Sequence, residues 1–125
     1  MKIILILYTI IIVLLAILPI NNGNGFLNDN FILSFRLDYI AHFAIFIPWM
    51  LISWLFYASW ESRTLLRIFG WILLGLILAV ATEFVQYLLP YRAFNINDLA
   101  ANVLGVMLGG LFFIFKPKRK KEPEL

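Results

Sequence analysis

Apolar side chains fill four long stretches of this chain, and these stretches constrain its fold more than any other feature. They run approximately over residues 3–20, 38–57, 65–89 and 98–115. Each is close to the ~20 residues that a helix needs to cross ~30 Å of hydrocarbon. Only helices and closed barrels span membranes, because backbone groups in lipid must be bonded internally. Strand-like alternation is absent from the sequence, so we predict an all-α integral membrane protein, a bundle of four transmembrane helices.

The composition agrees with a membrane environment. The 125 residues are 63% hydrophobic and 14% charged, whereas soluble domains carry about a quarter charged residues. We predict one transmembrane domain at residues 1–115 and a basic tail at residues 116–125. Because the tail directly follows an apolar stretch, we interpret it as a membrane-surface anchor and expect no nucleic-acid partner. The absence of cysteine excludes disulfides and Cys-ligated metal sites.

The first apolar stretch has some features of a signal peptide, because Lys2 precedes a long apolar core. No clear small-x-small cleavage site comes before Pro19. We therefore expect this stretch to remain in the protein as a transmembrane helix.

Basic residues predict the orientation, because cytoplasmic loops are enriched in Lys and Arg. If the N-terminus is cytoplasmic, only Arg36 and Arg92 lie on the outer side. The basic residues on the inner side are then Lys2, Arg63, Arg67, Lys116, Lys118, Arg119, Lys120 and Lys121. We predict that both termini are cytoplasmic and that the connections at residues 21–36 and 90–97 face outward.

Polar side chains gather near the outward ends of three of the predicted helices. His42 follows Asp38 by one turn, and Asn102 follows Asp98 by one turn. Glu83 lies about two turns before the end of its helix. An ionisable residue within a membrane is by default a functional candidate. We therefore predict one ligand-binding cluster, made of Asp38, His42, Glu83, Gln86, Arg92, Asp98 and Asn102.

Small residues continue two of these polar faces further into the bilayer. Gly75 and Ala79 do so in the third stretch, and Gly105 and Gly109 do so in the fourth. Small side chains let helix backbones approach closely in lipid, and residues 105–109 match the GxxxG pattern. We predict that these residues pack helices together. The GxxxG face is equally suited to another copy of the chain or to a neighbouring helix, so an oligomer is possible but not predicted.

Some of the polar residues also have plain structural interpretations. Asp38 can cap the start of its helix, and Asn97 or Asp98 can cap the fourth helix. Arg92 can extend to lipid headgroups as an interfacial residue, or it can clamp a phosphate or carboxylate. These alternatives remain open at the level of sequence.

The more deeply placed polar residues differ in how well structure alone explains them. His42, Gln86 and Asn102 can simply hydrogen-bond between helices. Glu83 is harder to explain in this way, because Gln or Ser would form such bonds at lower cost. Its protonation state stays open, and its candidate partners are His42, Arg92 and Arg36.

Catalytic and metal functions receive less support from the sequence. His42, Glu83 and Asp98 are suitable metal ligands by type, but one histidine without tight ligand spacing leads us to predict no metal and no cofactor. No serine stands at a GxSxG elbow. If the chain catalyses a reaction, the candidate acid and base residues are His42, Glu83 and Asp98.

Residues 37–46 (LDYIAHFAIF) and 82–110 (TEFVQYLLPYRAFNINDLAANVLGVMLGG) resemble the VanZ-like family of small bacterial membrane proteins. The family pattern falls on Asp38, His42, Glu83, Gln86, Pro90, Arg92, Asp98, Asn102, Gly105 and Gly109. The chain has Tyr39 where the family commonly has Lys, and Phe46 where it often has Tyr. The first departure removes a basic group from the outer cluster, and we hypothesise that Arg36 supplies a charge there instead.

The resemblance implies a multi-pass protein of the bacterial cell membrane. The family is named for a member associated with resistance to teicoplanin, a lipid-bearing glycopeptide that targets cell-wall precursors. Our leading hypothesis is a non-enzymatic envelope protein, in contact with membrane lipids, that binds a lipid-linked precursor, a phospholipid headgroup or a lipoglycopeptide. One alternative is an intramembrane enzyme acting on a lipid substrate. Another is a structural helix bundle whose polar groups bond only to each other.

Overall fold

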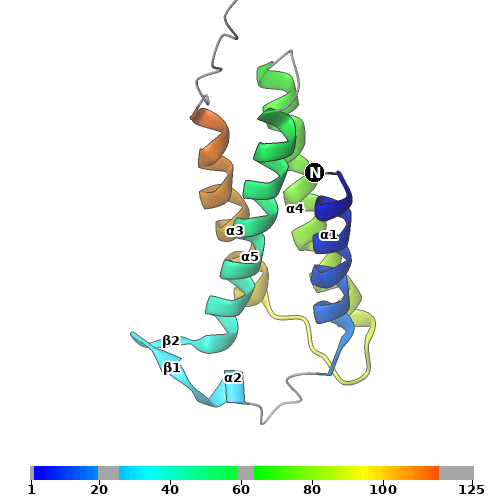
Figure 1. The fold of residues 1–125 in the computed structure, drawn as a ribbon. Coiled ribbons are helices and arrows are strands. Elements are labelled where there is room, and N and C mark those ends of the chain that lie inside the picture. The colour runs from blue at the N-terminus through cyan, green and yellow to red at the C-terminus, as the bar shows by residue number, and fades with distance from the viewer. Residues whose placement is uncertain (1, 20–25, 59–63, 116–125) are drawn as a thin grey trace, which may run out of the picture.

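The computed structural model describes residues 2–19, 26–58 and 64–115. The predicted basic tail and Arg63 lie outside the described residues. Within them the chain is helical apart from one small hairpin (Figure 1). The elements are α1 (Lys2–Ile17), α2 (Phe26–Asp29), β1 (Phe31–Ile32), β2 (Phe35–Arg36), α3 (Leu37–Ala58), α4 (Leu65–Leu88), α5 (Ile96–Gly110) and the 3-10 turn η1 (Leu111–Ile114).

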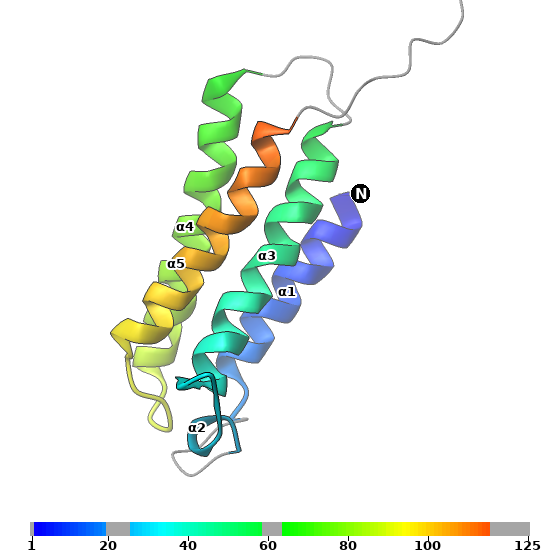
Figure 2. The ribbon, with the colours of Figure 1, turned by 90° about the vertical axis from the view of Figure 1, so that its left-hand side faces the viewer.

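The four long helices run side by side and alternate in direction (Figures 1 and 2). The start of α1 and the ends of α3 and α5 point to one end of the bundle. We call the opposite end the loop end: it holds α2, the hairpin and the α4–α5 connection at residues 89–95. The described part of the predicted connection at residues 21–36 and the connection at residues 90–97 therefore lie at the same end of the bundle.

Three of the helices are long and apolar enough to cross a membrane, over Leu37–Tyr57, Leu65–Leu88 and Ile96–Ile114. The 16 residues of α1 correspond to ~24 Å of helix, which is less than the ~30 Å hydrocarbon thickness. The chain is therefore an all-α membrane protein with three spans supported by length and composition. The fourth span and the side on which the termini lie remain predictions.

Prolines set two of the helix ends that the sequence placed too late. The first helix was predicted to reach residue 20, but α1 ends at Ile17, because Pro19 lacks an N–H and restricts Leu18. The third was predicted to reach residue 89, but α4 ends at Leu88. Leu89 is extended (φ −89°, ψ 131°), as expected for a residue that precedes Pro90.

Asn95 starts α5 earlier than the sequence predicted. Its side-chain oxygen accepts a hydrogen bond from the backbone N–H of Asn97 at 3.0 Å, so Asn95 is the N-cap. The helix consequently begins at Ile96 instead of residue 98, and the cap is neither Asn97 nor Asp98, the two residues that the sequence left open for this role. Asp98 lies in the first turn instead, where its charge complements the helix dipole.

The segment predicted as a long loop contains local structure that leads into α3. Phe31 pairs with Arg36 and Ile32 pairs with Phe35 in an antiparallel hairpin. The two turn residues, Leu33 (φ 47°) and Ser34 (φ 70°), both have positive φ. Positive φ at both central residues matches the twist of a two-residue hairpin. The hairpin delivers Arg36 directly to the start of α3.

Close packing of α3 against α5 forms the centre of the bundle. A Cβ atom added to Gly105 would overlap the backbone oxygen of Phe43, and one added to Gly109 would lie 2.6 Å from Cβ of Met50. The GxxxG face of α5 is thus occupied by α3. Around this contact Phe46, Met50 and Val106 are almost completely buried. Gly105 and Gly109 therefore permit the close contact of α3 and α5, because glycine has no side chain.

Two hydrogen bonds join α1 to α3. The Tyr8 hydroxyl donates to the backbone oxygen of Ile45 at 3.0 Å, and the Trp49 indole donates to the Thr9 hydroxyl at 2.8 Å. Large apolar side chains on the outer faces remain exposed, for example Phe69 at 73%. Exposed apolar surface of this extent suits contact with lipid.

Candidate functional site

Three helices bring polar side chains together about two turns inside the loop end. Asn102 on α5 donates its amide N–H to Oε1 of Glu83 on α4 at 3.2 Å. The carbonyl oxygen Oδ1 of the same amide lies 3.1 Å from Nδ1 of His42 on α3. Counted from the helix ends at the loop end, the three residues lie ~7–9 Å deep. Asn102 and Glu83 are buried, at 0% and 1% exposure.

His42 is the centre of a group of carboxylates. Its Nε2 lies 3.7 Å from Oδ1 of Asp38 and 3.9 Å from Oδ2 of Asp98. Its Nδ1 lies 3.7 Å from Oε1 of Glu83. Each distance exceeds that of a good hydrogen bond, so the imidazole is surrounded by carboxylates without bonding directly to any of the three. A single imidazole thus faces three acids in a largely buried setting, which is costly unless a positive charge balances them.

Arg36 supplies positive charge at the rim of this group. Its Nη2 lies 3.4 Å from Oδ2 of Asp38, and its Nη1 donates to the Tyr39 hydroxyl at 3.1 Å. The guanidinium also lies over the Tyr39 ring, 4.9 Å from the ring centre. The hypothesis that Arg36 places a charge beside Asp38 is confirmed. Tyr39 orients this charge through the hydrogen bond and the ring contact.

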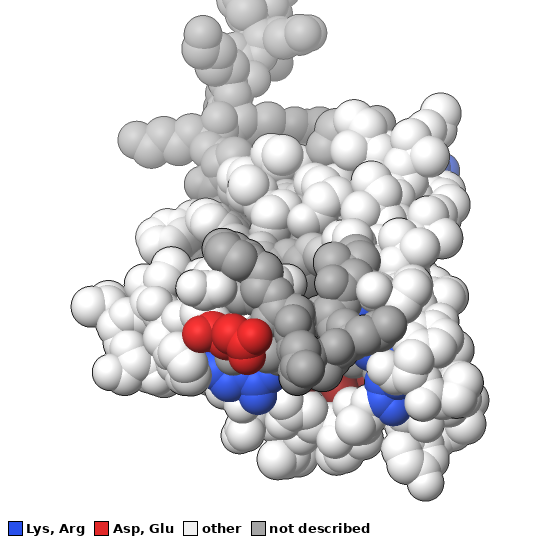
Figure 3. Space-filling view, turned by 90° about the horizontal axis from the view of Figure 1, so that it is seen from below, with Lys and Arg blue, Asp and Glu red and all other residues white. Residues whose placement is uncertain are grey.

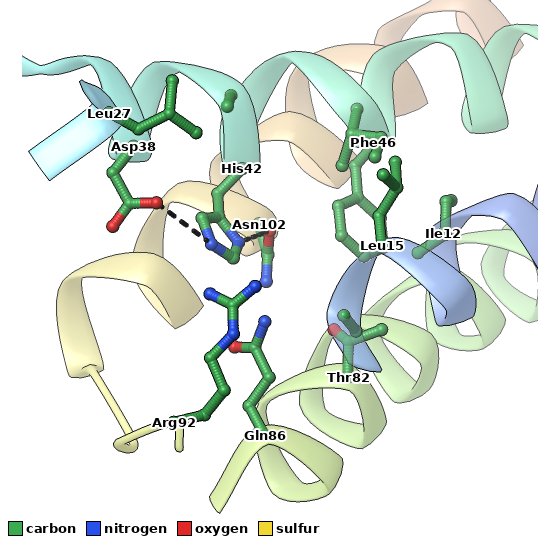
Figure 4. Close-up of a pocket in the computed structure, with 13 residues that line it drawn as sticks. Ile12, Leu15, Leu27, Asp38, His42, Phe46, Thr82, Gln86, Arg92 and Asn102 are labelled. Atoms are coloured by element: carbon green, nitrogen blue, oxygen red, sulfur yellow. Dashed lines mark hydrogen bonds and ion pairs between the residues drawn. The ribbon is translucent and has the colours of Figure 1, made fainter. Parts of the chain in front are cut away.

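A cavity of about 140 Å³ opens beside the imidazole. Figure 4 shows its two-sided lining. His42, Gln86 and Arg92 form a polar wall, and Ile12 and Phe46 belong to an apolar wall supplied by α1 and α3. The cavity therefore combines hydrogen-bonding groups with hydrocarbon contact in one space, which is the composition of a small-molecule site.

Arg92 reaches from the α4–α5 connection towards the cavity. Figure 4 shows its guanidinium pointing towards His42 and Asn102. Its Nη2 donates to the backbone oxygen of Leu18 at 2.8 Å, next to the bond from the Tyr91 hydroxyl to the oxygen of Ile17 at 2.7 Å. These bonds satisfy carbonyls at the end of α1, which have no partner within the helix.

Three polar atoms at the site lack a hydrogen-bond partner among the described residues. They are Oε2 of Glu83, Oδ1 of Asp98 and Nε of Arg92, and all three are buried. Asn95 offers a hydrogen bond to both carboxylates, from its backbone to Glu83 and from its side chain to Asp98, but neither of these two oxygens has a partner of good hydrogen-bond geometry in the described part of the chain. Buried polar groups are nearly always paired, so each exception needs a physical explanation.

The predicted site residues fall into two groups. Asp38, His42, Gln86, Arg92 and Asn102 line the cavity. Glu83 and Asp98 do not line it; each instead faces the imidazole at the distances given above. Of the packing residues, Gly105 and Gly109 contact α3. Gly75 lies against Trp49, Met50 and Val106, and Ala79 is fully buried.

Some residues of the site were missed by the sequence analysis. Thr82 lines the cavity one turn from Gln86, and an i, i+4 reading of α4 could have found it. Leu27 reaches the cavity from α2, which the sequence described only as loop. Tyr91 forms its bond to α1 from a connection with no periodic pattern.

Viewed from the loop end, the few visible charged side chains interrupt a mostly uncharged surface (Figure 3).

Comparison with known proteins agrees with the resemblance seen in the sequence. A family model described as VanZ/LLP1 matches residues 5–116. This chain belongs to the VanZ/LLP1 family. The match contains α1, α3, α4 and α5 almost completely, and every residue of the cluster lies within it.

One relative extends well beyond the region that it shares with this chain. An uncharacterized protein of the yeast Schizosaccharomyces pombe is 36% identical over 86 residues, which are 68% of this chain and 51% of the relative. The chain thus spans about half the length of that relative. No solved structure gives a significant match.

Proposed function

We propose that this VanZ/LLP1 protein binds the anionic headgroup of an amphiphile in the cavity at the loop end. The observation that carries the proposal is the two-sided lining of that cavity. Arg92, His42 and Gln86 offer donors on one wall, while Ile12 and Phe46 offer hydrocarbon on the other. An amphiphile carries the same two chemistries in one molecule.

Arg92 is the group that we propose meets the anion. Its Nη2 is used by Leu18, but its buried Nε has no hydrogen-bond partner among the described residues. A guanidinium N–H bonds strongly to phosphate or carboxylate oxygens. We assign His42 as a second donor, Gln86 and Asn102 as neutral hydrogen-bonding groups, and Glu83 and Asp98 as groups that orient them.

The cavity volume limits the ligand portion that enters. About 140 Å³ corresponds to between four and five waters at ~30 Å³ each. This suits a phosphate-sized headgroup but not an acyl chain or a whole glycopeptide. Acyl chains would lie along the exposed apolar helix faces, where Leu15 and Ile10 present hydrocarbon to the bilayer.

The orientation is part of the same proposal. In the sequence, more basic residues lie on the side of the termini than at the loop end. This asymmetry supports cytoplasmic termini and four spans. The loop end and its cavity would then face outward in a cell membrane. α1 would span the membrane although it is shorter than the hydrocarbon core, since local thinning of the bilayer accommodates short helices.

Resistance to teicoplanin is one form that such binding could take in a bacterial member. A family relative in a yeast supports a more general ligand, because fungi do not make bacterial cell-wall precursors. We therefore favour a phospholipid or another lipid-linked anion as the ligand class over the antibiotic itself.

Two alternatives receive different support. An intramembrane enzyme acting on lipid is favoured by the imidazole that lies 3.7–3.9 Å from three carboxylates, a distance that ligand binding could shorten. A self-satisfied structural network is disfavoured, because oxygens of Glu83 and Asp98 lack partners among the residues that the structure describes.

The test is a titration of the detergent-purified chain with short-chain phosphatidylglycerol and, in parallel, short-chain phosphatidylcholine. We expect tighter binding of the anionic lipid and a loss of at least about tenfold in Arg92→Gln, because a charge-assisted hydrogen bond contributes about 1.5–3 kcal/mol. Arg67→Gln removes the same charge at the other end of the bundle and should bind like wild type. Equal affinity for both lipids, or an unaffected Arg92→Gln, would contradict the proposal.

The enzyme alternative is tested with the same protein. Wild type and His42→Gln are incubated with mixed lipid vesicles, and products are followed by mass spectrometry. A product that forms only with wild type favours the enzyme. Unchanged lipids together with selective binding favour the binding protein.

A further inference from the structure

Three side chains at the starts of α3 and α5 gather the donor atoms of a metal site. Asp38, His42 and Asp98 each offer one ligand atom, and these atoms lie within 4.8 Å of one another. Nε2 of His42 is 3.7 Å from Oδ1 of Asp38 and 3.9 Å from Oδ2 of Asp98. We propose that Asp38, His42 and Asp98 bind a divalent transition-metal cation, which departs from the metal-free expectation of the sequence analysis.

The hydrogen bonds behind His42 orient its other nitrogen towards the proposed ion. Asn102 presents its NH₂ to Glu83 and its carbonyl to His42. The carbonyl only accepts, so Nδ1 of His42 carries a hydrogen. In the neutral imidazole Nε2 then has a free lone pair directed at two carboxylates. Metal-binding histidines are typically held in this way by a second-shell acceptor on the other nitrogen.

Asp98 provides an independent indication that the cluster is incomplete. Its side chain is only 10% exposed, and Oδ1 is buried without a hydrogen-bond partner among the described residues. A carboxylate in such a place needs a cation or a donor. The proposed ion would bind the other oxygen of this carboxylate, Oδ2, which faces His42, and its charge would stabilise the whole group.

The charges around the cluster leave room for a cation. Asp38, Asp98 and Glu83 contribute three acids, whereas Arg36 forms its ion pair with Oδ2 of Asp38 at 3.4 Å, and its charge also acts on Asp98. The inner oxygen of Asp38, Oδ1, faces His42 and is the one that we assign to the ion. Arg92 is a further cation on the cavity wall, but its Nη2 donates a hydrogen bond to the backbone oxygen of Leu18.

The distances suit a small ion with mixed nitrogen and oxygen ligands. Donors bound tetrahedrally at ~2.1 Å lie ~3.4 Å apart, so the two distances from His42, 3.7 Å and 3.9 Å, require contraction by a few tenths of an ångström, while the two carboxylates, which lie within 4.8 Å of each other, would also move together. One imidazole and two carboxylates suit Zn²⁺ or Mn²⁺. Asp38 and His42 also line the cavity, so a remaining coordination position would open into it. The ion site does not depend on the proposed headgroup binding: with an ion on Nε2, His42 no longer donates to the headgroup, and the ion would meet the anion in its place.

The test uses full-length, tag-free protein in detergent, because a histidine tag would itself bind metal. After dialysis against a chelator, Zn²⁺ is titrated by calorimetry and Mn²⁺ by electron paramagnetic resonance. We expect saturation at a single ion per chain, with a loss of affinity of at least tenfold in Asp98→Asn and in His42→Gln. Asp29→Asn removes an exposed acid on α2 and should leave binding unchanged.

A spectroscopic measurement separates this site from non-specific binding. Co²⁺ bound by nitrogen and oxygen ligands in a tetrahedral site absorbs visible light more strongly than hydrated Co²⁺, and the band should vanish in Asp98→Asn. Circular dichroism and gel filtration check that each variant is folded, and His42→Gln serves if Asp98→Asn is not. Wild type that binds none of these ions, or binding that persists in both variants, overturns the proposal. Neither result bears on the phosphatidylglycerol titration, so the two proposals fail separately.

Discussion

The Asn102 side chain bonds to Glu83 across the α4–α5 interface at 3.2 Å and presents its other face to His42 at 3.1 Å. One amide therefore connects three helices within the bundle. Because an amide has a donor end and an acceptor end, it fixes the orientation of His42 relative to Glu83. The direction of Nε2 of His42 depends on this relationship.

Replacing Asn102 by Leu should destabilise the bundle by about 1–2 kcal/mol, because Glu83 and His42 both lose a buried partner. The measurement is unfolding of the purified protein by titration with denaturing detergent. Leu104→Ala alters an exposed residue of the same helix, at 61% exposure, and should change stability by less than about 0.5 kcal/mol. If both substitutions changed the stability equally, the Asn102 amide would contribute no more to stability than an exposed side chain of the same helix.

Glu83→Gln should be tolerated better than Glu83→Leu. The amide oxygen of Gln can still accept from Asn102 in place of Oε1, whereas Leu leaves the Asn102 donor unpaired at a cost of about 1–2 kcal/mol. Thermal unfolding of both variants in the same detergent measures the difference. If Glu83→Gln were as unstable as Glu83→Leu, the charge and not the hydrogen bond would be the stabilising feature.

Gly105→Ala should weaken the α3–α5 contact by about 1–3 kcal/mol, the usual range for overpacking. The added methyl group would overlap the backbone oxygen of Phe43, which cannot move without displacing α3. Gly70→Ala is the matched control, because nothing lies within 4 Å of its added methyl group and alanine stabilises a helix interior by about 0.5–1 kcal/mol. The expected opposite signs are read from thermal unfolding; a loss at both positions would contradict this account.

Tyr91→Phe should loosen the end of α1 without reducing lipid binding. It removes the bond to the oxygen of Ile17, at a cost of about 0.5–1 kcal/mol, but leaves the Arg92 guanidinium in the cavity wall. Hydrogen exchange near residues 14–18 should accelerate, while the phosphatidylglycerol titration stays at the wild-type value. Weaker lipid binding in Tyr91→Phe would mean that the seating of α1 itself is part of the binding site.

Labelling of introduced cysteines tests the proposed orientation against a clean background, since the chain has no cysteine. Ala93→Cys lies in the exposed α4–α5 connection, and Glu122→Cys lies in the basic tail. In intact cells a membrane-impermeant maleimide should label only Ala93→Cys. Both positions should react after permeabilisation. The reverse pattern would place the loop end in the cytoplasm.

The sequence by itself determined the number and order of the long helices, because apolar runs of membrane-spanning length have few alternatives in lipid. It also placed Glu83, His42 and Asn102 at one depth, since rise per residue converts sequence position into height. The family resemblance followed from the same residues and was confirmed by the match over residues 5–116. Local signals such as Pro19 and Asn95 were present in the sequence, yet helix ends were still misplaced by a few residues.

Tertiary structure alone decided which polar groups meet and which remain unpaired. Depth does not specify rotation about a helix axis, so the sequence could not show that Asp98 approaches the same side of His42 as Asp38. Nor could it show that the GxxxG face of α5 is occupied by α3. Rotation follows from the packing of whole helix surfaces against one another. That packing leaves a cavity beside His42 and an unpaired oxygen on Asp98.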